Sequence, residues 1–219
     1  RTRAVRARAR SAAEAGFTAV AARLADAAPA DGTRLDGDSL TPTALERVAD
    51  EAISDAGADP AAATAVEPVT LHPGEPIVVS VAPRVDGARA PLARTFVVDG
   101  TGGWERRAAV AVEMAHDAAS RVVEPGVPAR RVVDEAVAEL GAYGFAAGDG
   151  PVARALDGSV EFTSDVELES GQRFVLDPVA REPDPDDDRR VRVSAHYVVT
   201  DEGRRRLGSL PTSLTPADY

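Results

Sequence analysis

The chain contains no cysteine and no lysine, and it has no long hydrophobic run. Without cysteine it has no disulfides, thiolate metal sites or cysteine nucleophile, which is typical of a reducing compartment. A membrane-spanning helix needs about 18 consecutive apolar residues, and no stretch approaches that length. The basic start RTRAVRARAR also lacks the apolar run of a secretion signal. We therefore expect a cytoplasmic protein that does not span a membrane.

Arginine supplies all 25 basic residues, and 36 acidic residues leave a net charge of −11. Such a surface repels nucleic acid backbones and keeps a protein soluble in high salt. The composition is typical of a halophilic archaeon, and the alternative is an acidic protein from a mesophile. We expect no nucleic-acid partner, because the basic run Arg204, Arg205 and Arg206 is too short on so acidic a chain.

The first half of the chain predicts two helices and a hairpin. Apolar residues recur at helical spacing over 4–28, and a polar connector follows over 31–39. Thr41 and Pro42 are typical of a second helix start, which we expect Gly57 to end. The hairpin is expected as two buried strands over 76–82 and 92–98, with the turn at Asp86-Gly87.

The second half repeats this order. Helices are predicted over 104–123 and 128–142, followed by an irregular segment over 144–160. Strands are predicted over 173–179 and 191–200, joined by an acidic loop. A helix-helix-hairpin unit that occurs twice indicates an α+β domain with pseudo-twofold symmetry, whereas the alternative is an unrelated chain whose elements happen to repeat.

Several motifs resemble the pita-bread peptidases of family M24, which include creatinase, Xaa-Pro aminopeptidase, prolidase and methionine aminopeptidase. GEPIVVSVAPRVDGARAPLARTFVVDG (74–100) resembles the first metal-binding hairpin of that family, and 115–145 resembles the helix pair that follows. LESGQRFVLDP (168–178) and VRVSAHYVVTDEG (191–203) are similar to the two strands of the second hairpin, and LPTSL (210–214) also fits. The resemblance covers nearly the whole chain.

This resemblance implies an α+β pita-bread fold with one curved antiparallel sheet and helices on its outer face. It also implies a single domain over 1–219. Since the chain begins with Arg1 and not Met, we expect an N-terminal part of the full-length protein to be missing.

The family's chemistry requires five ligands for two divalent ions held about 3.5–4 Å apart around a shared water. By the resemblance, its two hairpin aspartates fall on Ser80 and Pro91, which keep the family's spacing of 11. Its histidine falls on Asp149 within Gly148-Asp149-Gly150, and its two glutamates fall on Asp177 and Ser194. None of the five ligands is retained intact. These residues are the cleft positions equivalent to the metal ligands.

We therefore predict a catalytically degenerate member of this family, with no catalytic residues and no metal cofactor. Asp149 and Asp177 would hold at most one weakly bound cation such as Mg²⁺. The cleft would serve as a binding or regulatory module for a peptide or protein partner, and a homodimer is a further expectation. A purely structural role beside a missing domain is a duller alternative.

The remaining alternative is an active hydrolase, either Xaa-Pro aminopeptidase-like or prolidase-like, or creatinase-like with a cleft histidine in place of metals. His72, His116 and His196 are the histidines, and none falls where the family uses one. Ser80 and Ser194 have no base placed by a motif to activate them. The acidic loop 182–190 lacks the spacing and glycine of a calcium loop, so we expect a solvated hairpin tip.

Overall fold

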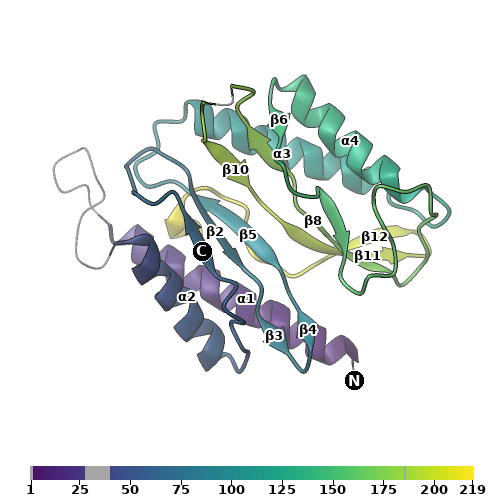
Figure 1. Cartoon of the computed structure of the whole chain (residues 1–219), viewed down its shortest axis with the longest axis horizontal. Helices are drawn as coiled ribbons and strands as arrows, with labels where there is room; N and C mark the ends of the chain where they lie inside the picture. The colour runs from purple at the N-terminus through teal and green to yellow at the C-terminus, as the bar shows by residue number, and fades with distance from the viewer. Residues whose placement is uncertain (1, 28–39, 185) are drawn as a thin grey trace. The chain divides into compact units, whose positions relative to one another are not determined.

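The computed structural model describes residues 2–27, 40–184 and 186–219 (Figure 1). They form two compact units, the first made of Arg1–Thr101 with Ser209–Tyr219 and the second of Gly102–Gly208. Each unit contains two helices and antiparallel strands. The connector predicted over 31–39 lies outside the described residues.

In the first unit, the two helices predicted from the sequence are α1 (Thr2–Ala25) and α2 (Pro42–Asp55). They lie side by side (Figure 1). The hydroxyl of Thr41 accepts a hydrogen bond from the backbone N–H of Ala44 at 3.1 Å, which caps the start of α2. Gly57 follows the helix with a φ of +77°, a left-handed conformation that glycine adopts without strain. Both predicted signals for the bounds of α2 are therefore confirmed.

The sheet of the first unit has the order β1-β2-β5, with β1 at Ala65–Glu67, β2 at Ile77–Val81 and β5 at Leu92–Phe96. The inner face of β2 consists of alternate residues that pack on the helices in one core, and the core members include Phe17, Val20, Leu24, Leu45, Ile53, Ile77, Val79 and Val81. Side chains alternate across a strand, so Val78 and Ser80 lie on the opposite face.

Two details of this sheet differ from the sequence prediction. The short strand β1 was not predicted. The turn at Asp86-Gly87 does not join the two main strands directly, because it closes a two-residue ribbon of β3 (Arg84–Val85) and β4 (Ala88–Arg89) between them. Both turn residues have positive φ values of 45° and 82°, as tight hairpin turns require. A 3₁₀ turn, η1 (Pro216–Asp218), ends the unit.

In the second unit, α3 (Trp104–Arg121) and α4 (Ala129–Ala142) form the predicted helix pair. The carboxylate of Glu105 accepts hydrogen bonds from the backbone N–H groups of Gly102 and Gly103 at 2.8 and 3.1 Å, so it caps α3. None of the described helices is long and apolar enough to cross a membrane.

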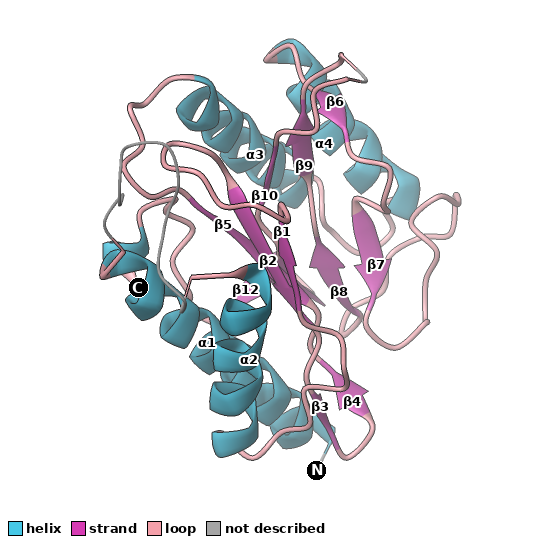
Figure 2. Ribbon diagram, turned by 60° about the vertical axis from the view of Figure 1, so that its left-hand side comes forward, coloured by secondary structure: helices cyan, strands magenta, loops and turns pink. Residues whose placement is uncertain are grey.

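The strands of the second unit form two sheets, ordered β10-β9-β6 and β12-β11-β8-β7. Helix α3 packs on β9 and β10, and α4 packs on β6 (Figure 2). The strand bounds are β6 Ala146–Ala147, β7 Ala153–Ala155, β8 Arg173–Leu176, β9 Val179–Arg181, β10 Arg190–Arg192, β11 Ala195–Thr200 and β12 Gly203–Leu207.

The predicted second hairpin is present, but each of its long strands is interrupted. Leu176 pairs with Ala195 and Val179 pairs with Arg192, so β8–β11 and β9–β10 share one register across the gap. The gap falls at Asp177-Pro178 on one side, where proline has no N–H to donate to the ladder. The segment 144–160, predicted to be irregular, contributes β6 and β7, and β12 was not predicted.

Candidate functional site

The predicted site residues of the first unit are Ser80 on β2 and Pro91 just before β5. Ser80 pairs with Ala93, and Val81 pairs with Leu92. By alternation, both predicted positions lie on the sheet face opposite α1 and α2, and both are half-buried. A neutral hydroxyl and a prolyl ring replace two carboxylates, so this face offers a divalent ion no charged ligand at either position.

The Arg94-Thr95-Phe96 motif lies on β5 and supports the scaffold. Arg94 is 1% exposed. Its guanidinium donates hydrogen bonds to the carbonyls of Ala93 and Pro211, both at 2.7 Å, and lies 5.8 Å from the ring centroid of Phe17. The ring of Phe96 contacts Tyr219 edge to face. These contacts join β5 to the C-terminal segment.

Asp177 is the central predicted residue of the second unit, and its carboxylate is 5% exposed. Arg192 holds it in bidentate fashion, with Nε to Oδ1 at 2.8 Å and a terminal nitrogen to Oδ2 at 2.6 Å. Arg154 donates a further hydrogen bond to Oδ2 at 3.2 Å. Paired guanidinium and carboxylate groups of this geometry are among the strong charge-assisted interactions in proteins. Two guanidinium groups therefore hold the carboxylate at this predicted ligand position.

Ser194 is fully buried and lies in the gap between β10 and β11. Because the ladder keeps one register on either side of that gap, Ser194 lies directly opposite Asp177. The two residues predicted for the second hairpin are thus brought together on one sheet face. That face is opposite α3, because His116 of α3 contacts the other face through Tyr197.

Asp149 lies on the turn after β6, and its side chain is 92% exposed. Its nearest charged partner is Arg181 at 3.8 Å. The preceding Gly148 passes so close to β9 that a Cβ there would lie 2.9 Å from the Cβ of Val179. The glycine of the predicted Gly-Asp-Gly segment is therefore required by packing, whereas the aspartate extends into solvent.

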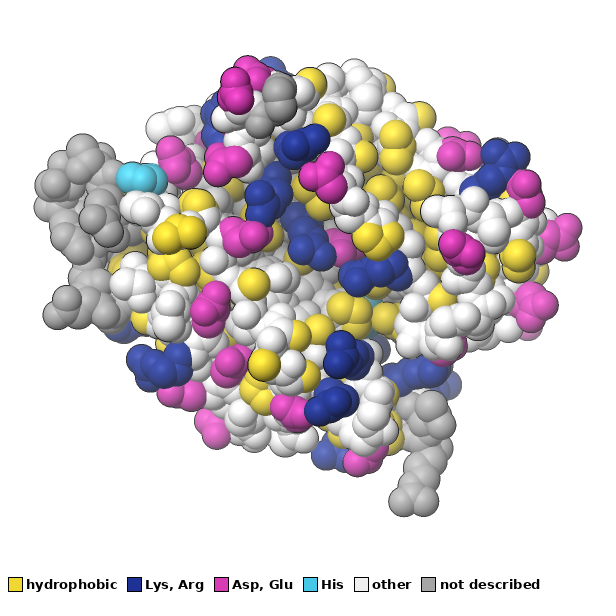
Figure 3. All heavy atoms as spheres, in the orientation of Figure 1, with side chains coloured by type: hydrophobic (Ala, Val, Ile, Leu, Met, Phe, Trp, Pro, Cys, Tyr) yellow, Lys and Arg dark blue, Asp and Glu magenta, His cyan; other side chains and the backbone are white. Residues whose placement is uncertain are grey.

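Four arginines share the sheet face that carries Asp177. Arg181, Arg190 and Arg192 alternate along β9 and β10, and Arg154 pairs with Val175 on β8. Figure 3 shows arginine side chains in dark blue gathered over these strands. We call Arg154, Arg181, Arg190 and Arg192 the arginine row. Arg154 and Arg192 pair with Asp177, and Arg181 pairs with Asp149, so guanidinium groups line this face of an acidic chain.

This donor set does not fit two divalent ions. Two of the five positions have lost their charge in the first unit, and a buried serine stands at a third. Of the remaining aspartates, one is held by arginine and the other is exposed. Among residues 2–27, 40–184 and 186–219, no group of three or more His, Cys, Asp or Glu side chains is arranged to hold a metal ion.

The sequence profile of metallopeptidase family M24 matches residues 2–201. The chain belongs to metallopeptidase family M24.

Solved structures with the same fold include a prolidase and a dipeptidase. The prolidase of Pyrococcus horikoshii has a TM-score of 0.79 at 16% identity, over 96% of this chain and 62% of that one. The dipeptidase PepE of Mycobacterium ulcerans has a TM-score of 0.72 at 21% identity, over 94% of this chain and 58% of that one. The α+β pita-bread fold predicted from the sequence is thereby confirmed.

Proline aminopeptidase P II of Yersinia pestis is also similar, with a TM-score of 0.77 at 19% identity, over 98% of this chain and 57% of that one. The M24 chain thus spans about three fifths of the length of these structures. No curated protein matches this chain.

The three histidines of this M24 chain occupy different environments. His116 lies on α3, where its Nε2 is 2.8 Å from the carbonyl oxygen of Val193. His72 is half-buried in a loop of the first unit. His196 is 3% exposed and pairs with Val175, so it lies on the same sheet face as Asp177, two residues beyond Ser194.

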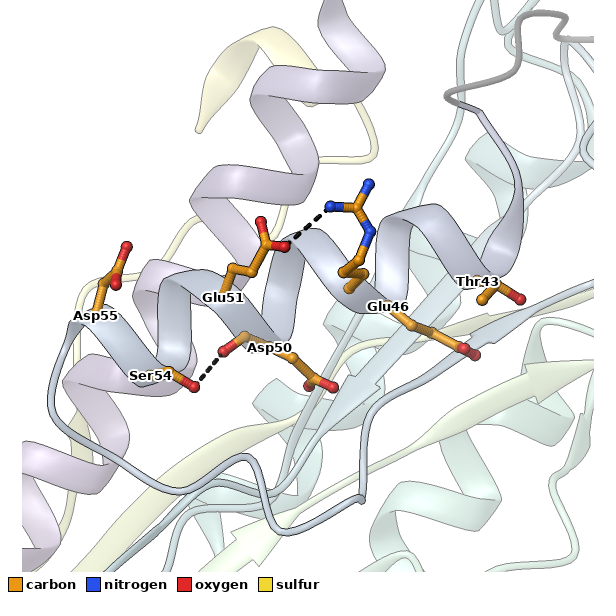
Figure 4. Close-up of a pocket in the computed structure, with 7 residues that line it drawn as sticks. Thr43, Glu46, Asp50, Glu51, Ser54 and Asp55 are labelled. Atoms are coloured by element: carbon orange, nitrogen blue, oxygen red, sulfur yellow. Dashed lines mark hydrogen bonds and ion pairs between the residues drawn. The ribbon is translucent and has the colours of Figure 1, made fainter.

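A depression of about 590 Å³ lies on the outer side of α2 and includes none of the predicted positions (Figure 4). Several of its polar side chains already have partners: Thr64 donates to Asp50, Glu46 accepts from the backbone N–H of Val66, and Arg47 pairs with Glu51. It therefore adds no chemistry to the site.

Proposed function

We propose that this M24 chain is a catalytically degenerate pita-bread module that binds a peptide or protein segment and does not hold a dinuclear metal centre. The observation that carries the proposal is the bidentate pairing of Asp177 with Arg192, supplemented by Arg154. A divalent ion would have to displace two guanidinium groups from this carboxylate.

Electrostatics supports the same proposal. A metal centre needs several oxygen ligands whose negative charge balances the ions, and its affinity depends sharply on ligand number and geometry. On the Asp177 face, the arginine row places cationic groups beside the one buried carboxylate. Coulomb repulsion from these groups opposes the entry of a divalent cation. Solvent and salt screen this repulsion least where the groups are buried.

Metal content and hydrolysis test this proposal together. Protein purified without chelators would be analysed for Mn, Co, Fe and Zn by mass spectrometry, and incubated with Xaa-Pro dipeptides and tripeptides. We expect less than one metal equivalent per chain and no cleavage. Two equivalents with metal-dependent cleavage would overturn the proposal.

A double variant, Arg154→Gln with Arg192→Gln, provides a control for the role of the arginines. Removing both guanidinium groups leaves the Asp177 carboxylate available, so we expect Mn²⁺ binding to become measurable as a single weak site by calorimetry. Arg131→Gln is the matched control, because the ion pair of Arg131 within the described residues is with Glu135, on the exposed side of α4. Equal Mn²⁺ binding in all three proteins would show that the arginines do not block this carboxylate.

A second candidate function is a metal-independent hydrolase of the creatinase type. The observation that favours it is the position of His196, buried on the Asp177 face at the strand position next but one to Ser194. A general base must lie within hydrogen-bond reach of the proton that it abstracts. Hydrolysis of small amides or amidines that is lost in His196→Gln but retained in His116→Gln would support this candidate; inactive wild-type protein would exclude it.

A further inference from the structure

Two members of the arginine row have a buried donor atom with no partner. The Nε atoms of Arg154 and Arg181 are inaccessible to solvent and make no hydrogen bond. Each guanidinium group has one long ion pair: Arg154 lies 3.2 Å from the carboxylate of Asp177, and Arg181 lies 3.8 Å from the carboxylate of the exposed Asp149. A buried donor left unpaired costs on the order of 1–3 kcal/mol, so these two guanidinium groups are not fully satisfied by the described residues.

The acceptor must be anionic to match this surface. Arginine presents its N–H groups as a planar fork that fits the two oxygens of a carboxylate. The side chains of Arg154 and Arg181 remain 41% and 31% exposed, so their outer nitrogens can be reached from solvent.

The spacing of the two arginines indicates an extended ligand. Arg154 lies beside Val175, and Arg181 lies six residues further along the same strand direction. At about 3.3 Å per residue this amounts to roughly 20 Å between the two strand positions, which the long side chains shorten. One small anion cannot bridge such a distance, whereas an extended peptide with acidic side chains several residues apart can.

We propose that the arginine row is a docking surface for an acidic peptide segment, with one carboxylate at Arg154 and another at Arg181. This inference rests on the proposed function and gives its ligand a chemical class. The carboxylates would accept hydrogen bonds from the exposed outer nitrogens of Arg154 and Arg181, and they would bring negative charge to a face lined by guanidinium groups.

Fluorescence anisotropy with the full 219-residue chain tests this inference. The probe is a labelled eight-residue peptide with glutamate at positions 1 and 7, in a serine-glycine background. We expect saturable binding at low salt, at least tenfold weaker binding when glutamine replaces both glutamates, and weakening as salt screens the charges.

Variants of the protein locate the binding surface. Arg181→Gln and Arg154→Gln should each weaken binding at least tenfold, Arg181→Lys should fall between wild type and Arg181→Gln, and Arg131→Gln should bind as wild type does. Circular dichroism checks that each variant is folded. No binding by wild-type protein, equal loss in Arg131→Gln, or equal binding of single-stranded DNA would each overturn the inference.

The two proposals fail separately. Two bound metal equivalents would overturn the proposed function whatever the peptide does. A chain that contains no metal and does not bind the acidic peptide would overturn only the inference of a docking surface.

Discussion

Arg192 holds the carboxylate of Asp177 through two hydrogen bonds of 2.8 and 2.6 Å, across a hairpin whose register is unbroken at this point. The acceptor is almost fully buried, whereas the arginine is 30% exposed. Removal of the arginine would leave the buried carboxylate with Arg154 alone, and unpaired buried charges are strongly destabilising.

We therefore predict that Arg192→Ala lowers the free energy of unfolding by about 2–3 kcal/mol, less than for a fully orphaned buried charge because Arg154 remains. Urea unfolding at pH 7 measures the change. Arg131→Ala, which removes an exposed helix arginine, should cost less than about 0.5 kcal/mol. Equal effects of the two substitutions would contradict a special role for the Asp177 pair.

Gly148→Ala provides a test of the close approach between β6 and β9. An added Cβ would meet the Cβ of Val179 at 2.9 Å, a distance that real structures avoid, so β6 would have to shift. We expect a loss of about 1–3 kcal/mol in unfolding free energy. Gly150→Ala is the matched control, because an added Cβ there meets nothing within 4 Å.

A second substitution separates this clash from other effects of alanine. In Gly148→Ala with Val179→Gly, the added methyl would no longer meet the Val179 side chain, whose Cβ is its nearest contact. The cost of the Gly148 substitution should therefore be smaller in the Val179→Gly background than in wild type, measured as a double-mutant cycle. Strict additivity would contradict the proposed contact.

Much of the fold follows from signals that are local in the sequence. The capping hydroxyl of Thr41 and the left-handed Gly57 determine the bounds of α2 directly. The missed strands have weaker signals. The strand β1 is three residues long and precedes a proline, and β12 carries three arginines that resemble a solvated surface. Pro178 divides the strand that was predicted to continue through 173–179.

The candidate site could be predicted only in part, because its contacts are not local in the sequence. Resemblance gives the positions Asp177 and Ser194, but the partners of a carboxylate depend on strand register, which is a long-range property. Arg154 lies in a segment predicted to be irregular, so its approach to Asp177 could not be foreseen. The alternation of Arg190 and Arg192 along the sequence indicates one charged face of this strand. The ligand roles of these positions, the single-domain organisation and the cytoplasmic location stay predictions.

Arg94→Lys should show that the retained motif on β5 needs a guanidinium and not merely a charge. Arg94 donates from separate nitrogens to the carbonyls of Ala93 and Pro211, and a single ammonium group cannot reproduce that fork. We expect a loss of about 2 kcal/mol or more in unfolding free energy, because carbonyl acceptors and a buried cation are left poorly matched. Limited proteolysis should also cleave the C-terminal segment after Leu210 faster than in wild type. An unchanged cleavage rate would contradict the proposed link between Arg94 and this segment.

Tyr197→Phe tests the contact between α3 and the helix-facing side of β11. The hydroxyl of Tyr197 lies 3.5 Å from Nδ1 of His116, and burial raises the pKa of this tyrosine above its usual value of 10.0. A raised pKa in the folded state means that the stability from neutral Tyr197 is full below about pH 10 and is lost as pH rises through the folded pKa. Wild-type protein should therefore lose more stability than Tyr197→Phe above about pH 10.

At pH 7 the same substitution should cost no more than about 1 kcal/mol, because the hydrogen bond is long. Urea unfolding at a series of pH values measures both effects, and Tyr143→Phe controls for loss of a tyrosine outside this contact. Absorbance at the tyrosinate wavelength should show, in wild type, an ionisation above the usual tyrosine pKa of 10.0 that is absent from Tyr197→Phe. Parallel curves of unfolding free energy against pH for the two proteins above pH 10 would contradict the raised pKa of Tyr197. A tyrosine that stays neutral in the folded state and ionises in the unfolded state lowers the unfolding free energy as the pH rises.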